Sequence, residues 1–206
     1  ATRTTLMITF VGLFFAGILG ILLGVLSGLF GGWIDDLVNF LISARNSIPS
    51  LIIGLVVSTI FGSSPTTLIV LIACVQWSGF ARQSRAMTLQ IRNENFIDCS
   101  RALGASSGRI IREHILRNIA SPLIVTATMN VSGTIMLESS LSFLGLGIQP
   151  PATSLGVMVA NGRDYMINNW WLAIIPSITI CVIVLSVALI GDWLRDKLDK
   201  KNDGRS

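Results

Sequence analysis

Long apolar segments separated by short polar stretches constrain what this 206-residue chain can fold into. A helix needs roughly 20 residues to cross the hydrocarbon core of a bilayer. Five segments reach that length: Leu6–Phe30, Leu37–Phe61, Thr66–Ala86, Ile119–Leu144 and Trp170–Leu194. Uninterrupted apolar runs such as Leu51–Val57 lack the alternation of polar and apolar residues that a membrane β-barrel strand requires. The sequence therefore predicts an all-α polytopic membrane protein with five transmembrane helices.

The composition agrees with a membrane protein. Only 13% of the residues are charged, whereas a soluble domain carries about 25%, and the mean hydropathy is +0.71. Lysine and arginine exceed aspartate and glutamate by 15 to 11. Because these cations cluster between apolar segments, we interpret the excess as a topology signal and expect membrane lipid, not nucleic acid, as the environment. Cys74, Cys99 and Cys181 have no C-x-x-C spacing and are predicted to be free thiols.

The positions of the cations predict the orientation of the chain. The end of the third segment and the stretch after it contain Arg82, Arg85, Arg92, Arg101, Arg109, Arg112 and Arg117, and the tail contains Arg195, Lys197, Lys200, Lys201 and Arg205. Two crossings separate these regions, so both lie on one side, which the positive-inside rule makes cytoplasmic. We expect a cytoplasmic loop at residues 87–118, an external loop at residues 145–169 and a cytoplasmic C-terminus. Since the chain would begin outside and has no initiator Met, we also expect a further helix upstream in a longer protein.

Small residues recur at every fourth position of the first segment, at Gly12, Ala16, Gly20, Gly24 and Gly28. This spacing places them on one face of a helix, where the missing side chains let a second helix approach closely. We interpret this face as a helix-packing surface. A pore-lining surface is the alternative.

Serine followed by proline predicts two helix starts, at Ser64-Pro65 and at Ser121-Pro122. A serine hydroxyl can accept a hydrogen bond from a free backbone N–H of the first turn, and proline suits the first helical position. Both pairs therefore predict the beginning of a transmembrane helix.

No group of residues predicts catalysis or a bound cofactor. The chain has no Gly-x-x-x-x-Gly-Lys-Ser/Thr loop to hold nucleotide phosphates. A serine hydrolase needs a base beside its nucleophile, but His114, the single histidine, lies in the predicted cytoplasmic loop, and a zinc site needs several ligands. The two candidates for an aspartyl mechanism, Glu138 and Asp192, are predicted near opposite membrane faces. We expect a non-catalytic chain without metal or cofactor; an intramembrane hydrolase is the enzymatic alternative.

Two ionisable residues lie within the predicted helices. Glu138 would be costly in lipid, so it must face the helix bundle or a watery cavity. Lining of a pathway and a hydrogen-bonded structural role fit Glu138 equally, and Ser139 and Ser142 are candidate pathway residues beside it. Arg45 is expected to extend toward the cytoplasmic interface rather than to pair with Glu138.

The loop at residues 87–118 has a helical pattern of its own. Asp98–Leu103 is predicted to form a short helix that Gly104 ends, and Ser106 or Ser107 is predicted to cap a second helix. Apolar residues of the second helix share one side: Ile110, Ile111, Ile115, Leu116 and Ile119. This pattern fits two interpretations equally well. The loop is a docking site that presents the bend to a partner, or the second helix is an amphipathic helix that only anchors the loop.

The run Asp98-Cys99-Ser100-Arg101-Ala102-Leu103-Gly104, followed by His114-Ile115-Leu116, resembles the EAA loop of ABC-importer permeases. The sequence departs from that pattern where Asp98 replaces Glu, Cys99-Ser100 replaces Ala-Ala and Arg117 replaces the closing Pro. The runs Leu141–Pro151 and Gly191–Asp199 are similar to those of the C-type membrane subunit in the dipeptide/oligopeptide/nickel permease family.

This resemblance implies a six-helix subunit, of which five helices are present, forming a single permease domain over residues 1–206 in a bacterial inner membrane. It also implies a heterodimer with a homologous B-type permease, two ATP-binding subunits that carry ATP and Mg, and an external solute-binding protein. The ATPase would contact the loop at Asp98, Arg101, Ala102, Leu103, Gly104, Ala105 and Ser106. The implied function is alternating-access transport of di- or oligopeptides, with nickel or metal chelates as alternative substrates. A stand-alone channel or secondary transporter is the alternative of another class.

Overall fold

The computed structural model describes the backbone of residues 1–203 and the side chains of residues 1–197. Within that part the chain is helical and contains no strand. The elements are α1 (Thr2–Phe30), α2 (Gly32–Ser47), α3 (Ser50–Phe61), α4 (Pro65–Arg92), α5 (Asn95–Ala102), α6 (Ser107–Arg109), the π-helical turn η1 (Ile110–Ile115), α7 (Leu116–Leu141), the π-helical turn η2 (Ser142–Leu146), α8 (Leu155–Arg163) and α9 (Trp171–Asp203). Of the tail cations, Arg205 lies outside the described residues, as do the side chains of Lys200 and Lys201.

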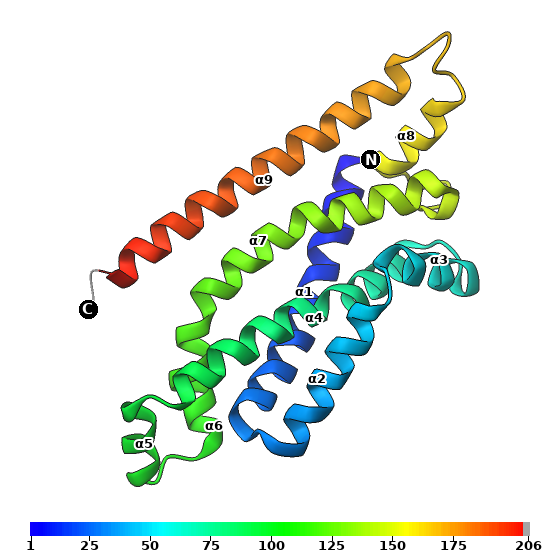
Figure 1. Cartoon of the computed structure of the whole chain (residues 1–206). Coiled ribbons are helices and arrows are strands. Elements are labelled where there is room, and N and C mark those ends of the chain that lie inside the picture. Colours follow the sequence, from blue (N-terminus) through cyan, green and yellow to red (C-terminus); the bar gives the residue numbers. More distant parts are fainter. Residues whose placement is uncertain (204–206) are drawn as a thin grey trace.

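The long helices determine which parts of the chain meet. Helix α1 packs along α4, and α7 packs against α1, α4 and α9. Figure 1 shows α9 running alongside α7, with α5 and α6 at one end of the molecule and α3 and α8 at the other. The predicted cytoplasmic loop and the predicted external loop therefore lie at opposite ends.

Among the residues that the structure describes, three helical stretches are long and apolar enough to cross a membrane: Thr2–Phe30, Ser107–Leu146 and Trp171–Lys197. Helices α2 and α3 are long and apolar enough to cross a membrane only when they are taken together. They are bent by 85° at the break between them. Helix α4 contains the predicted third segment but is not among these stretches, because its C-terminal half is rich in polar residues. The number of crossings therefore remains a prediction.

One continuous helix over Leu37–Phe61 was predicted, and this is wrong. Helix α2 ends at Ser47 and α3 begins at Ser50. Pro49 has no N–H to continue the hydrogen-bond ladder and disfavours a helical conformation at the residue before it. Ile48 accordingly has extended angles, with φ −104° and ψ 124°.

The two predicted Ser-Pro helix starts have different outcomes. Ser64 caps α4 as predicted: its hydroxyl accepts a hydrogen bond from the Thr67 N–H at 3.1 Å, and Pro65 is the first helical residue. Ser121-Pro122 does not start a helix, because α7 begins at Leu116 and contains Pro122. Buried Ile119 and Leu123 pack on either side of the proline, and this tertiary packing keeps the chain helical there.

The Arg45 side chain is held by two neutral groups, and no ion pair among the described residues joins it to Glu138. Its Nε donates to the Val75 carbonyl at 2.8 Å and its Nη2 donates to the Ser50 hydroxyl at 2.8 Å. The break after α2 places Ser50 within reach, and α4 supplies the carbonyl, so both partners depend on tertiary structure.

An ion pair joins the ends of three helices. Arg85 of α4 donates from Nε and Nη2 to the two oxygens of Asp35 in α2, at 2.5 and 2.7 Å. The same carboxylate accepts hydrogen bonds from the hydroxyl of Ser27 in α1 and from the Asn39 side chain. Such a two-pronged guanidinium–carboxylate contact fixes orientation as well as distance. It therefore ties α1, α2 and α4 together at the end that carries α5.

Candidate functional site

The segment between α4 and α7 forms a compact helix–turn–helix. Helix α5 ends at Ala102, and Gly104 takes the left-handed conformation with φ +83°. The Gly104 N–H donates to the Arg101 carbonyl at 2.9 Å, and the Ala105 N–H donates to the Ser100 carbonyl at 3.0 Å. These are the two hydrogen bonds of a Schellman motif, which ends a helix and reverses the chain at a glycine.

The second helix of this segment begins at the predicted cap. The Ser106 hydroxyl accepts a hydrogen bond from the Arg109 N–H at 3.4 Å, so Ser106 rather than Ser107 is the cap. After α6 the chain passes through η1 and continues into α7 without a break. The loop and the base of α7 are therefore joined by continuous helical backbone.

Apolar and aromatic contacts hold the two halves of the loop together. Ile97 of α5 is fully buried, as are Ile110 and Ile115 of η1. The Phe96 ring lies 5.6 Å from the His114 ring, measured between centroids. The Ser100 hydroxyl lies 3.4 Å from the same histidine, at Nε2. Helix α5 and η1 thus pack as one unit.

One residue predicted on the apolar side of the second loop helix is not buried. Ile110, Ile115 and Ile119 are buried, but Leu116 is 39% exposed. The π-helical turn η1 inserts a wider turn before Leu116, which rotates this residue relative to an ideal α-helix. A regular helical period could not have predicted that rotation.

The exposed side of the loop brings together the predicted ATPase-contact residues. Leu103 is 88% exposed at the tip, between exposed Ala102 and Gly104. On the exposed surface of α5, the Arg101 Nη1 lies 3.6 Å from the Asp98 Oδ1. An exposed ion pair of this kind adds little stability. Ala105 is half-buried, and Ser106 is exposed. Leu103 is thus the large apolar side chain of this exposed surface.

The predicted pathway residues gather at the other end of α7. Glu138 is 1% exposed, and its Oε1 accepts a hydrogen bond from the Ser142 hydroxyl at 2.8 Å. The Ser142 hydroxyl also lies 3.4 Å from that of Ser154, which caps α8. The second carboxylate oxygen of Glu138 and the hydroxyl of Ser139 are buried without a hydrogen-bond partner among the described residues.

The loop and the Glu138 cluster are well separated. Glu138 lies 22 residues after Leu116 along α7, which corresponds to about 33 Å of helix. The structure therefore does not bring the predicted coupling residues and the predicted pathway residues into one site. Helix α7 connects the two regions directly.

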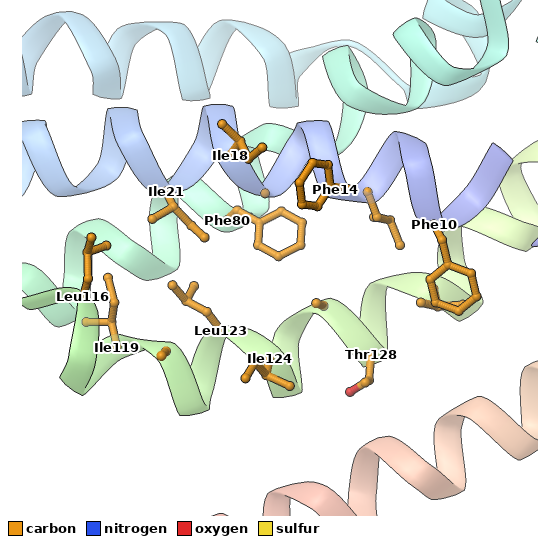
Figure 2. Close-up of a pocket in the computed structure, with 15 residues that line it drawn as sticks. Phe10, Phe14, Ile18, Ile21, Phe80, Leu116, Ile119, Leu123, Ile124 and Thr128 are labelled. Atoms are coloured by element: carbon orange, nitrogen blue, oxygen red, sulfur yellow. The ribbon is translucent and has the colours of Figure 1, made fainter. Parts of the chain in front are cut away.

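An apolar groove of about 520 Å³ lies between α1 and α7. Figure 2 shows Leu123 of α7 pointing toward α1, with the Phe80 ring between the two helices. Thr128 supplies the only polar side chain of its lining. The groove therefore lacks groups that could compensate a charged solute.

Neither a metal site nor a disulfide forms in the described part of the chain. No three His, Cys, Asp or Glu residues gather there in a group that could hold a metal ion. The three cysteines are exposed free thiols.

Comparison with known proteins identifies the family. The model of the family described as "Binding-protein-dependent transport system inner membrane component" matches residues 20–203. The chain belongs to this family. The resemblance drawn from its loop and from its later motifs is confirmed at that level.

Two curated relatives are peptide transport permeases. The oligopeptide transport system permease protein OppC of Haemophilus influenzae is 34% identical over 200 residues, covering 97% of this chain and 64% of that protein. The di/tripeptide transport system permease protein DppC of Pseudomonas aeruginosa is 37% identical over 155 residues, covering 75% of this chain and 51% of that protein. The chain spans between half and two thirds of the length of these relatives.

Solved structures support the same fold. A chain of the MetNI methionine ABC transporter matches with a TM-score of 0.76 and 23% sequence identity, covering 94% of this chain and 93% of that chain. A chain of an amino acid ABC transporter matches with a TM-score of 0.66 and 15% identity, over 97% and 91% of the two chains. The all-helical arrangement is thus the fold of these two chains.

Proposed function

We propose that this chain is the membrane permease subunit of an ATP-driven importer that carries di- or oligopeptides across a bacterial inner membrane by alternating access. The observation that carries the proposal is the α5–Gly104–α6 unit. One side of this unit is packed against the rest of the chain, and Leu103 is exposed on the other side. The peptide-transport relatives supply the substrate class.

The proposed energy source is a separate ATPase. The sequence has no phosphate-binding loop, so ATP and Mg would be held by two ATP-binding subunits. One of them would receive the loop at Asp98, Arg101, Ala102, Leu103, Gly104, Ala105 and Ser106. Binding at this surface can bias the pathway only if the contacts differ between the two states of the permease. The uninterrupted connection from α6 through η1 to α7 supports such coupling.

The proposed topology has five crossings, with α2 and α3 as one bent crossing and α4 as another. Packing of α4 along the apolar helix α1 supports its inclusion despite its polar half. The loop at residues 87–118 and the C-terminus would be cytoplasmic, and residues 145–169 would be external. A homologous B-type permease would complete the pathway, and a solute-binding protein would deliver the substrate from outside.

Uptake measurements test the proposed function. The chain is reconstituted with its partner subunits and solute-binding protein in liposomes, and labelled di- and oligopeptides are competed against nickel and nickel chelates. We expect ATP-dependent peptide uptake that unlabelled peptides suppress and nickel does not. Uptake of nickel instead would replace peptides with the alternative substrate. Uptake without ATP or an ATPase would support a stand-alone transporter.

Replacing Glu138 by Gln is expected to reduce peptide uptake several-fold while the complex assembles normally. Glutamine keeps the shape of the side chain and an oxygen that can accept the Ser142 hydrogen bond, but it removes the carboxylate. Uptake and the yield of purified complex are measured for Glu138→Gln and for Glu113→Gln, which alters an exposed carboxylate in the loop. Failure of only the Glu138 variant to assemble would assign Glu138 a structural role.

A further inference from the structure

The break between α2 and α3 places polar side chains beside α4, which the proposed topology puts in the membrane. Arg45 of α2 contacts the Val75 carbonyl of α4, which lies 10 residues after Pro65, the first residue of α4. Ten residues correspond to about 15 Å along a helix of about 42 Å. The contact is therefore well inside the length of α4. Discontinuous helices recur at the substrate sites of membrane transporters, because their free backbone ends and side chains offer polar contacts there.

The charge of Arg45 is not neutralised by its partners. A backbone carbonyl and the Ser50 hydroxyl hold the guanidinium, and both are neutral. Among the described ion pairs none includes Arg45, whereas Arg85 is paired with Asp35. A lone cation inside a bilayer is costly and marks an ion or substrate pathway. No carboxylate among the described residues pairs with Arg45, so a bound anion would offset its charge.

Arg45 is partly exposed as a residue, and two hydrogen bonds orient its guanidinium. Arg45 is half-buried, and its two hydrogen bonds use only part of the five N–H donors of the group. Next to it, the Asn46 side-chain oxygen accepts a hydrogen bond from the Ser78 hydroxyl at 3.2 Å. Ser47 is exposed at the end of α2. This polar cluster contrasts with the apolar groove between α1 and α7, which offers no charged group.

We propose that Arg45 binds the C-terminal carboxylate of a peptide during its passage through the membrane. The inference rests on the proposed peptide-import function. A guanidinium offers parallel N–H donors that match a carboxylate, and such charge-assisted bonds are short and directional. The Val75 carbonyl and Ser50 hydroxyl orient the group without cancelling its charge. Every peptide with a free C-terminus has the required carboxylate, so Arg45 would bind a group that all these substrates share.

The test compares a peptide acid with its C-terminal amide in the reconstituted complex. A peptide is chosen whose acid and amide forms both bind the solute-binding protein in a prior titration. ATP-dependent uptake of the acid by the wild-type complex comes first, since its absence would contradict the import function rather than the role of Arg45. The variants are Arg45→Gln, Arg45→Lys and, as a control that removes an exposed charge at the start of α1, Arg3→Gln.

We expect Arg45→Gln to lower uptake of the acid about tenfold, the effect of losing a charge-assisted hydrogen bond, and to leave uptake of the amide unchanged. Arg3→Gln should alter neither. An equal loss for acid and amide, or no loss for either, would overturn the proposal. If Arg45→Gln yields no complex, Arg45→Lys decides: a lower acid-to-amide uptake ratio is expected because an ammonium lacks the paired donors, and an unchanged ratio would overturn the proposal.

Discussion

A valine at Gly104 is expected to reduce ATP-driven uptake about tenfold while the chain still inserts and assembles. Gly104 has φ +83°, a conformation that a β-branched residue adopts only under strain. Holding such a residue there costs about 1–3 kcal/mol, and 1.4 kcal/mol corresponds to a tenfold change in the population of the native turn. Because the turn sets the direction of α6 relative to α5, its loss misplaces Leu103 and the docking surface.

Gly108 provides the matched control for this variant. It lies four residues later in α6, does not have a positive φ, and, like Gly104, has open space where a Cβ would lie. Gly108→Val therefore introduces the same side chain without the same backbone strain. Uptake and ATP hydrolysis are measured for both variants at equal amounts of assembled complex. Normal uptake by Gly104→Val would contradict the role of this turn in coupling.

Gly20→Ala is expected to lower the free energy of unfolding by about 1–3 kcal/mol, the usual effect of forcing extra atoms into a packed interface. A Cβ at Gly20 would lie against the backbone of α4, at the Trp77 carbonyl and 2.9 Å from the Ala81 nitrogen. Backbone atoms cannot rotate away as a side chain can, so α1 and α4 must separate. Gly24 meets α4 in the same way, at Ser84 and at the carbonyl of Ala81.

Gly17→Ala is the control, because a Cβ at Gly17 has no atom within 4 Å. Both variants change helix propensity alike, since each replaces a glycine by alanine in the interior of α1. Thermal and denaturant unfolding of the purified protein in mild detergent measure the difference. Equal stability of Gly17→Ala and Gly20→Ala would show that close contact with α4 is not what the glycine at position 20 provides.

Features governed by neighbouring residues were predictable from the sequence. Gly104 as the end of α5 and Ser106 as a possible cap follow from local hydrogen-bonding rules. The glycines of α1 follow from spacing, although the sequence does not say that α4 is the helix they face. Ser64-Pro65 as the start of α4 is likewise a local signal.

Features governed by tertiary contacts were not predictable. The bend at Pro49 could not be predicted from the apolar run over residues 37–61, because both halves are apolar enough to belong to one helix. Pro122 stays inside α7 because buried neighbours hold the helix around it. The partners of Arg45 and the link from Glu138 through Ser142 to Ser154 connect separate elements, so neither pattern nor spacing could have found them.

Site-specific cross-linking tests most directly whether the α5–Gly104–α6 loop is the surface through which an ATPase drives this chain. A photoreactive amino acid is placed at Leu103, which is 88% exposed, and in a second variant at Ile167, which is 96% exposed in the predicted external loop. Each variant is assembled with all partner subunits in liposomes, irradiated and analysed by mass spectrometry. We predict an adduct with the ATP-binding subunit from position 103 and none from position 167. An ATPase adduct from position 167, or none from position 103 in a complex that transports peptide, would contradict the account.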